Sequence, residues 1–227
     1  MVNCAAYTAV DRAESEEELA TLINGEAVGA LASWANARSV PLVTFSTDYV
    51  FPGTSGKPYV ETSPTDPVNA YGRSKLVGER IALEHGALVV RTSWVISGSH
   101  PNFVATILRE VKDQELRVVD DQRGCPTVAA DLARASLAAH RAGVTGLLHL
   151  TNQGETTWYE LARTSVGLAD SDPSRVSPSE TEDYPTPARR PAYSVLASER
   201  LESVGLDPMP HWRESIGDLV SELKTWI

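Results

Sequence analysis

Short, mostly apolar segments alternate with helical segments along this chain, and this alternation restricts the folds open to it. The segments 41–46, 87–91 and 146–150 are each dominated by apolar residues, and residues 1–6 form the end of one more such segment. Strands that are apolar along most of their length are typical of a parallel sheet covered on both faces. The chain is therefore predicted to form an α/β fold, a Rossmann-like doubly wound parallel sheet.

Helix signals lie between these strands. Ser15 followed by Glu18 has the spacing of a capping box, and the helix it begins is expected to end near Asn36. A second helix is expected over 71–85, closed by Gly86. The apolar side of the first helix is expected to comprise Leu19, Leu22, Ile23, Val28, Leu31 and Trp34.

The second half of the chain alternates less regularly. Residues 170–191 contain five of the 14 prolines and are expected to form a long loop or linker. From about residue 98 we expect a smaller, mixed region, with part of the sheet returning near Leu147. The other elements expected there are a strand at 116–119 and helices at 103–112, 127 or 130 to 140, 156–168, 196–204 and 211–226.

The composition excludes several classes of protein. Among 227 residues, Lys and Arg number 20 and Asp and Glu 30, which gives a net charge of −10. An acidic chain is a poor general binder of nucleic acid, because contacts with phosphate need a basic surface. No apolar run reaches the roughly 18–20 residues of a membrane helix, and the first residues lack the shape of a signal peptide. We therefore expect a cytoplasmic protein with no nucleic-acid or membrane partner.

Cysteine usage points the same way. Cys4 and Cys125 are the two cysteines of the chain, too few for a disulfide framework or a cysteine-based zinc site. We expect a reduced chain and name no metal-binding residue; whether the protein depends on a metal stays open.

Tyr71 and Lys75 are the first candidates for chemistry. They stand four residues apart at the start of the expected helix over 71–85, so their side chains share one face. A nearby ammonium is expected to lower the pKa of the Tyr71 phenol from about 10 toward neutrality, as suits a proton donor to a carbonyl oxygen that receives a hydride. The ordinary alternative is a partly buried tyrosine beside a solvated lysine.

The position of Thr47 strengthens the catalytic interpretation. This hydroxyl ends the predicted strand at 41–46, and ligands bind at the carboxyl ends of strands in open α/β sheets. A hydroxyl there, followed by Tyr-x-x-x-Lys on a helix, resembles the short-chain dehydrogenase/reductase superfamily. The alternative for Thr47 is a capping or turn hydroxyl.

Motifs spread over the chain resemble one family of that superfamily, the dTDP-4-dehydrorhamnose reductases. The resemblance runs almost from end to end and is more specific than the Tyr-Lys pair alone. The matching segments are 2–11, 13–15, 46–51, 71–75, 91–95, 118–122, 126–127, 157–159 and 184–191.

The resemblance implies a reductase that transfers a hydride from NADPH or NADH to C4 of dTDP-4-dehydro-β-L-rhamnose. Tyr71 would donate the proton to the C4 oxygen. Lys75 would lower the pKa of Tyr71 and hold the nicotinamide ribose. Thr47 would polarise the carbonyl, with Asp48 beside it in the substrate pocket.

Further roles follow from the same resemblance. Trp94 would line the sugar site, with a core aromatic as the alternative. Arg189 and Arg190 would bind the diphosphate, since guanidinium groups suit phosphate; their alternative is a basic pair on a surface loop. The residues that would lie along the cofactor are Ala5, Ala6, Tyr7 and Thr8. A homodimer is an assembly the family allows.

The sequence departs from the family pattern at three places. Ile96 stands where the family usually has a tyrosine, residues 99–101 replace a Gly- and Asn-rich stretch, and Cys125 replaces a smaller or hydroxyl residue. None of these departures removes Thr47, Tyr71 or Lys75.

The glycine-rich turn of a dinucleotide-binding fold is absent from this sequence. None of the 15 glycines has Gly-x-Gly-x-x-Gly or Gly-x-x-Gly-x-x-Gly spacing. The resemblance begins on the family's fourth strand, so two βα units would be missing. A misassigned start, a true truncation and a part supplied by another chain are the three explanations. Residues 1–97 would then be the remainder of an NAD(P)-binding Rossmann domain, and 98–227 mainly a substrate-binding region.

Two other functions stay open at this point. A non-catalytic or inactive relative of the same fold would also lack the glycine-rich turn. A nucleotide-sugar epimerase or 4,6-dehydratase would share the fold, but dehydratases carry Asp-Glu after the threonine, whereas Asp48 is followed here by Tyr49.

Overall fold

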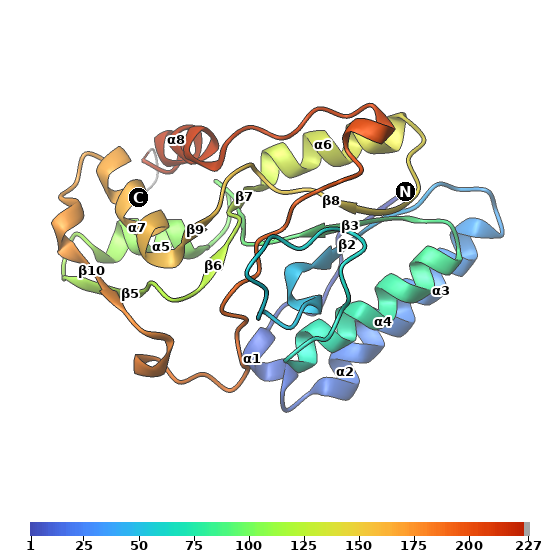
Figure 1. The fold of residues 1–227 in the computed structure, drawn as a ribbon, viewed down its shortest axis with the longest axis horizontal. Coiled ribbons are helices and arrows are strands. Elements are labelled where there is room, and N and C mark those ends of the chain that lie inside the picture. The colour runs from blue at the N-terminus through green and yellow to red at the C-terminus, as the bar shows by residue number, and fades with distance from the viewer. Residues whose placement is uncertain (225–227) are drawn as a thin grey trace. The chain divides into compact units, whose positions relative to one another are not determined.

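A four-stranded parallel sheet is the centre of the first of two parts of the structure (Figure 1). Its strands are β1 (Val2–Asn3), β2 (Val43–Thr47), β3 (Leu88–Thr92) and β8 (Gly146–His149), in the order β1-β2-β3-β8. Every residue of β3 is buried, as expected of a strand covered on both faces. The predicted α/β fold with a parallel sheet is confirmed. The first strand is shorter than expected, since residues 4–6 lie outside it.

The computed structural model describes residues 1–224 and divides into two compact units. The first unit comprises residues 1–92, 134–150 and 186–207. The second comprises 93–133, 151–185 and the residues from Pro208 onward. No helix within residues 1–224 is long and apolar enough to cross a membrane.

The helices that precede β2 and β3 in the chain pack on one face of the sheet (Figure 1). They are α1 (Val10–Ala13), α2 (Glu17–Thr21), the π-helix η1 (Leu22–Glu26), α3 (Ala27–Asn36) and α4 (Ala70–Glu84). Residues of α3 and α4 form an apolar core with β3 and its flanks, comprising Val28, Ala32, Ala35, Leu42, Ala82, Ala87 and Val89.

The predicted start of the first long helix is wrong. Ser15 does not cap α2; its hydroxyl donates to the carbonyl of Arg12 (3.1 Å), because the short helix α1 and its turn precede α2. The N-cap residue is Glu16, which makes no side-chain capping bond. The predicted end at Asn36 is confirmed.

The predicted apolar side of that helix is also wrong in large part. Leu19, Leu22 and Trp34 are 43%, 50% and 47% exposed. The π-helix η1 fits an extra residue into one turn and so rotates the buried face away from the regular period. The face that meets α4 carries small residues, and a Cβ on Gly25 or Gly29 would press against side chains of α4.

Gly78 of α4 allows the closest of these approaches. A Cβ on Gly78 would overlap the backbone carbonyl oxygen of Asn24 in η1. We expect Gly78→Ala to destabilise the protein by about 1–3 kcal/mol, because backbone must move to relieve the overlap. Denaturant unfolding measures this. Gly217→Ala, also within a helix but facing open space, is the control and should stabilise by about 0.5–1 kcal/mol; equal effects would contradict this packing.

The described part of the second unit combines short strand pairs with helices. Its strands are β4 (Val95–Ile96), β5 (Leu116–Val119), β6 (Arg123–Gly124), β7 (Thr127–Val128), β9 (Thr156–Thr157) and β10 (Val176–Ser179). Its helices are α5 (Phe103–Glu110), α7 (Trp158–Leu168) and α8 (Trp212–Leu223). The helix α6 (Ala129–Arg141) contributes residues to both units.

Two predictions for the second half of the chain need correction. The expected loop 170–191 contains β10, which pairs in parallel with β5, and two 3-10 turns, η3 (Pro173–Arg175) and η4 (Thr181–Asp183). In place of the expected helix 196–204, Leu196 forms a β-bridge with Tyr59 and only η5 (Glu202–Val204) is helical. The expected end of the last helix at Trp226 lies outside the described residues.

Candidate active site

Thr47 lies at the carboxyl end of β2, where the sequence places it. Its Oγ1 accepts a hydrogen bond from the backbone N–H of Tyr49 (3.1 Å) and donates to Asp48 Oδ1 (3.0 Å). These contacts turn the chain into the 3-10 helix η2 (Asp48–Val50). Thr47 and Asp48 are both buried. Thr47 therefore lies at the predicted strand end and also caps η2, the role that was the alternative to a catalytic one.

Several buried polar atoms near this strand end have no partner. Ser46 Oγ, Thr92 Oγ1 and Asp48 Oδ2 are buried and form no hydrogen bond within the described residues. Ser46 and Thr92 belong to β2 and β3, and Thr92 is in register with Thr47. Because buried polar groups are usually satisfied, this group fits a polar ligand at the carboxyl ends of β2 and β3.

Helix α4 presents the predicted Tyr-Lys pair on one face. The side chain of Asn69 caps the helix by accepting from Gly72 N–H (2.8 Å). The regular helix that follows places Tyr71, Lys75 and Glu79 at successive turns. The Tyr71 ring meets the Tyr49 ring edge-on, with 6.0 Å between centroids.

The pKa of Tyr71 differs from the expectation. Burial of the phenol raises its pKa to about 12, the charge of Asp48 raises it further, and a hydrogen bond with the Thr47 side chain lowers it. Lys75 is not among the groups that shift it. The expected lowering of the Tyr71 pKa by Lys75 is therefore wrong for the chain by itself.

Lys75 is a buried ammonium whose hydrogen-bond donors are unused within the described residues. It is 6% exposed, and burial lowers its pKa to about 8 against the opposing charge of Glu79. Within the described residues its ammonium forms neither a hydrogen bond nor an ion pair. An ammonium has three protons to donate, so Lys75 fits hydroxyl groups of a bound ligand.

A buried ion pair anchors α4 to the sheet behind Lys75. Glu79 of α4 pairs in two-pronged fashion with Arg91 of β3, and Arg91 Nε lies 2.9 Å from a carboxylate oxygen. Both side chains are at most 4% exposed. Arg91 also lies over the Phe51 ring, 4.9 Å from its centroid.

His149 completes this buried cluster as a neutral ring. Burial lowers its pKa to about 4. Its Nδ1 lies 2.9 Å from the carbonyl of Ala197, so Nδ1 carries the proton and donates, and Nε2 faces Arg91 Nη1 at 3.4 Å. The cluster is thus one carboxylate and one guanidinium next to an uncharged imidazole, with no unpaired charge among them.

Asn24 is a site residue that the sequence reasoning missed. Its Oδ1 accepts from Tyr7 N–H (2.9 Å), and its Nδ2 donates to the Tyr7 carbonyl (3.0 Å) and to Ser74 Oγ (2.9 Å). Ser74 in turn donates to the carbonyl of Tyr71 (2.8 Å). One buried amide therefore ties the residue 5–8 loop to the helix that carries Tyr71. The sequence signal that could have identified Asn24 was a polar amide side chain among the apolar residues of a predicted helix.

The residue 5–8 loop and Tyr71 pack against the same small apolar cluster. Tyr7 and Tyr71 both pack against a small cluster formed by Ala13, Ala20 and Ala70. The Tyr7 hydroxyl donates to Glu16 (2.7 Å), and Ala5 and Thr8 are exposed.

The two candidate phosphate ligands differ in their surroundings. Arg190 forms a two-pronged ion pair with Asp11 (2.5 and 2.8 Å) and also donates to Thr186 Oγ1 (2.8 Å). Arg189 has an exposed side chain, while its carbonyl accepts from Asn69 (2.9 Å). Arg190 thus holds the loop in place, and Arg189 is the guanidinium that faces solvent.

Trp94 belongs to the second unit, where it stacks on Trp158. The ring centroids are 3.7 Å apart with 11° between planes. Trp94 has a left-handed backbone (φ 45°), and Gly124 leaves room for its ring, since a Cβ there would lie 2.5 Å from it. Ile96 and Cys125, two departures from the family pattern, are both 2% exposed.

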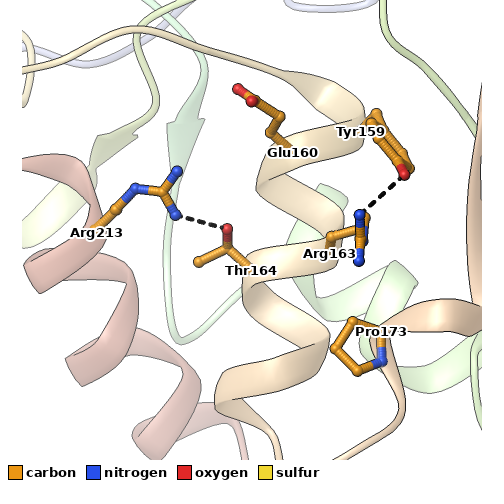
Figure 2. Close-up of a pocket in the computed structure, with 6 residues that line it drawn as sticks. All are labelled: Tyr159, Glu160, Arg163, Thr164, Pro173 and Arg213. Carbon is orange, nitrogen blue, oxygen red and sulfur yellow. Dashed lines mark hydrogen bonds between the residues drawn. The ribbon is translucent and has the colours of Figure 1, made fainter.

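An open pocket on the second unit contains none of the predicted site residues (Figure 2). Arg213 donates to Thr164 Oγ1 (3.0 Å), and Arg163 donates to the Tyr159 hydroxyl (3.2 Å). These groups satisfy one another at the surface of α7 and α8.

The fold and the first unit's site define a class of protein. A parallel α/β sheet with a hydroxyl at a strand's carboxyl end and a Tyr-x-x-x-Lys helix beside it is the arrangement of a Rossmann-type reductase. The chain belongs to the family described as RmlD substrate binding domain, whose model matches residues 1–225.

Individual relatives agree with this assignment. A dTDP-4-dehydrorhamnose reductase of Streptomyces griseus is 46% identical over 225 residues, which cover 95% of this chain and 74% of the relative. One of Burkholderia thailandensis is 44% identical over 243 residues, covering 98% and 81%. The crystal structure of a dTDP-4-dehydrorhamnose reductase from Bacillus anthracis in complex with NADP superposes with a TM-score of 0.93 at 36% identity, covering 97% of this chain and 79% of that one.

Proposed function

We propose that this chain reduces a dTDP-4-keto sugar, transferring a hydride from NADPH to C4 of dTDP-4-dehydro-β-L-rhamnose to give dTDP-L-rhamnose. The observation that carries the proposal is the position of Thr47 at the carboxyl end of β2 next to Tyr71, with Lys75 one turn further along α4, in a chain 46% identical to a dTDP-4-dehydrorhamnose reductase. Neither an epimerase nor a dehydratase is favoured by any contact in the site.

Tyr71 and Thr47 are the groups that act on the substrate oxygen in this proposal. Tyr71 is protonated throughout the physiological range, because burial raises its pKa to about 12. It therefore holds the proton that the C4 oxygen needs when C4 receives the hydride. Thr47, whose side chain lowers the pKa of Tyr71, would polarise the same carbonyl.

NADPH is the cofactor in this proposal, in agreement with the NADP-bound Bacillus anthracis relative. When bound, it supplies the hydride. The residues present fit its nicotinamide ribose, since the buried Lys75 ammonium has donor capacity that no described residue uses. Residues 5–8 would lie along the cofactor, held by Asn24. The chain contains no glycine-rich turn for the pyrophosphate.

Substrate contacts complete the proposed site. Asp48 would face the sugar beside Thr47. Arg189, which faces solvent, is the better placed of the two arginines for the dTDP diphosphate, and Arg190 would hold its loop through Asp11. The assignment of Trp94 to sugar contacts stays a prediction.

The proposal also assigns roles to the two regions of the chain, a cell compartment and an oligomeric state. Residues 1–97 would serve the cofactor and 98–227 mainly the substrate. The reaction would take place in the cytoplasm. A homodimer is consistent with the exposed Leu19, Leu22 and Trp34 on α2, η1 and α3; light scattering after size exclusion would measure it.

Substrate-dependent oxidation of NADPH tests the proposed function. The protein is mixed with NADPH and dTDP-4-dehydro-β-L-rhamnose, and absorbance of the reduced nicotinamide is followed. We expect a loss of absorbance that requires the sugar nucleotide and saturates with it. Binding of NADPH without turnover would indicate the non-catalytic alternative and contradict the proposal.

A further inference from the structure

The hydroxyl of Thr47 has fewer protons than its predicted roles require. A threonine hydroxyl has one proton to donate and two lone pairs to accept with. One lone pair takes the N–H of Tyr49 (3.1 Å). The proton is donated to Asp48 Oδ1 at 3.0 Å, and the remaining lone pair is left for the neighbouring phenol of Tyr71, whose pKa the Thr47 side chain lowers. Thr47 can therefore donate to one of its neighbours only.

An ionised Asp48 fixes the direction of this chain. A carboxylate can only accept, so Thr47 must donate to it. The free lone pair of Thr47 then accepts the proton of Tyr71. In that arrangement neither hydroxyl offers a proton to a substrate carbonyl, because both protons point toward Asp48.

A neutral Asp48 reverses the chain. Its carboxyl O–H can donate to Thr47, which then donates onward to Tyr71 or to the substrate, and Tyr71 donates to the substrate. The negative charge that opposes ionisation of Tyr71 is also removed. Both hydroxyls are then oriented for reduction.

The surroundings of Asp48 favour the neutral form. The residue is 2% exposed, and Oδ2 accepts no hydrogen bond. Tyr71 faces it from α4, Tyr49 from its own turn and the Ser194 hydroxyl from the segment after Arg190. No described lysine or arginine forms an ion pair with it, and burial raises its pKa to about 6 against the lowering effect of hydrogen bonds with the Ser194 and Thr47 side chains.

We propose that Asp48 is a positioning residue which must be protonated for reduction, and that its proton sets the direction of the hydrogen-bond chain Asp48–Thr47–Tyr71 toward the substrate. This inference rests on the proposed function for its reaction. It adds no covalent step, since the proton that the C4 oxygen takes is still that of Tyr71.

Asp48→Asn tests the inference through its pH dependence. The amide of asparagine donates to Thr47 at every pH and carries no charge. The wild-type protein should therefore lose activity as rising pH ionises Asp48, whereas the variant should not. We expect the ratio of kcat/KM, variant over wild type, to rise at least about tenfold between about pH 5.5 and about pH 8. A ratio that stays constant, or a folded variant without activity at either pH, would overturn the proposal.

Asp66→Asn is the matched control, because Asp66 is an exposed carboxylate of the same unit. Its ratio to wild type should not change with pH. A change as large as that of Asp48→Asn would assign the effect to net charge and overturn the proposal.

A second measurement needs no turnover. Carbon NMR of carboxyl-labelled aspartate in the wild-type protein, with the Asp48 signal assigned from its loss in Asp48→Asn, should show a titration near pH 6. Titration at the ordinary aspartate value of about 4 would overturn the inference even in an active enzyme. If instead the wild-type protein fails to oxidise NADPH while Asp48 titrates near pH 6, the proposed function fails and the protonated state of Asp48 stands.

Discussion

Tyr71→Phe is expected to lower kcat for reduction by about a thousandfold, within the range of about 10²–10⁴ found for general acids. The variant keeps the ring but loses the hydroxyl that lies against Thr47. Fold and substrate affinity should change little, because the ring still packs against Ala13, Ala20 and Ala70. Steady-state kinetics that separate kcat from KM make this measurement.

Tyr49→Phe is the matched control for this variant. Its ring meets that of Tyr71 edge-on, so the two phenols share one environment, but the proposal gives Tyr49 no proton to donate to the sugar. We expect its kcat to fall far less than that of Tyr71→Phe. Equal losses in the two variants would contradict the assignment of proton donation to Tyr71.

Arg91→Met is expected to destabilise the protein by about 3–5 kcal/mol, because it leaves Glu79 as a buried charge without its partner. Both side chains of the pair are at most 4% exposed. Since folded proteins are stable by only about 5–15 kcal/mol, this is a large share of the total. Denaturant unfolding at neutral pH measures the change.

Two controls separate the buried charge from the loss of packing. Glu79→Leu combined with Arg91→Met removes both charges and should restore most of the lost stability. Arg73→Met breaks the pair with Glu17, in which both side chains are 44% exposed, and should cost at most about 1 kcal/mol. A double variant as unstable as Arg91→Met alone would contradict the account of the buried pair.

The sheet was predictable because its strands carry their own signal. The apolar segments at 41–46, 87–91 and 146–150 need burial on both faces, and a parallel sheet covered by helices offers it. β8 lies within its segment, and β2 and β3 each extend one residue past theirs, to Thr47 and Thr92. Tyr71 and Lys75 were predictable for a related reason, since spacing on a helix fixes which side chains share a face.

The buried face of α2, η1 and α3 was not predictable from helical periodicity. The π-helix changes the period within one turn, and close contact with α4 selects glycine and alanine over large apolar residues. Leu19 and Trp34 are exposed for that reason. β10 escaped notice because Val176–Ser179 lack the alternation of a half-buried strand. The two end residues are buried, the two middle residues are exposed, and one of them is a proline.

The electrostatics of the site also lay beyond the sequence. The pKa of Tyr71 depends on how deeply the phenol is buried and on where Asp48 lies, and neither follows from the spacing of Tyr71 and Lys75. The same holds for Asn24, whose three hydrogen bonds join segments 17 and 50 residues away along the chain.

Transfer of a labelled hydride tests the central claim most directly. The protein is supplied with NADPH deuterated at the nicotinamide C4 and with dTDP-4-dehydro-β-L-rhamnose, and the product is examined by NMR. The account predicts deuterium at C4 of the sugar with wild-type protein and almost none, over the same time, with Tyr71→Phe. Product without deuterium at C4, or equal labelling by the two proteins, would contradict it.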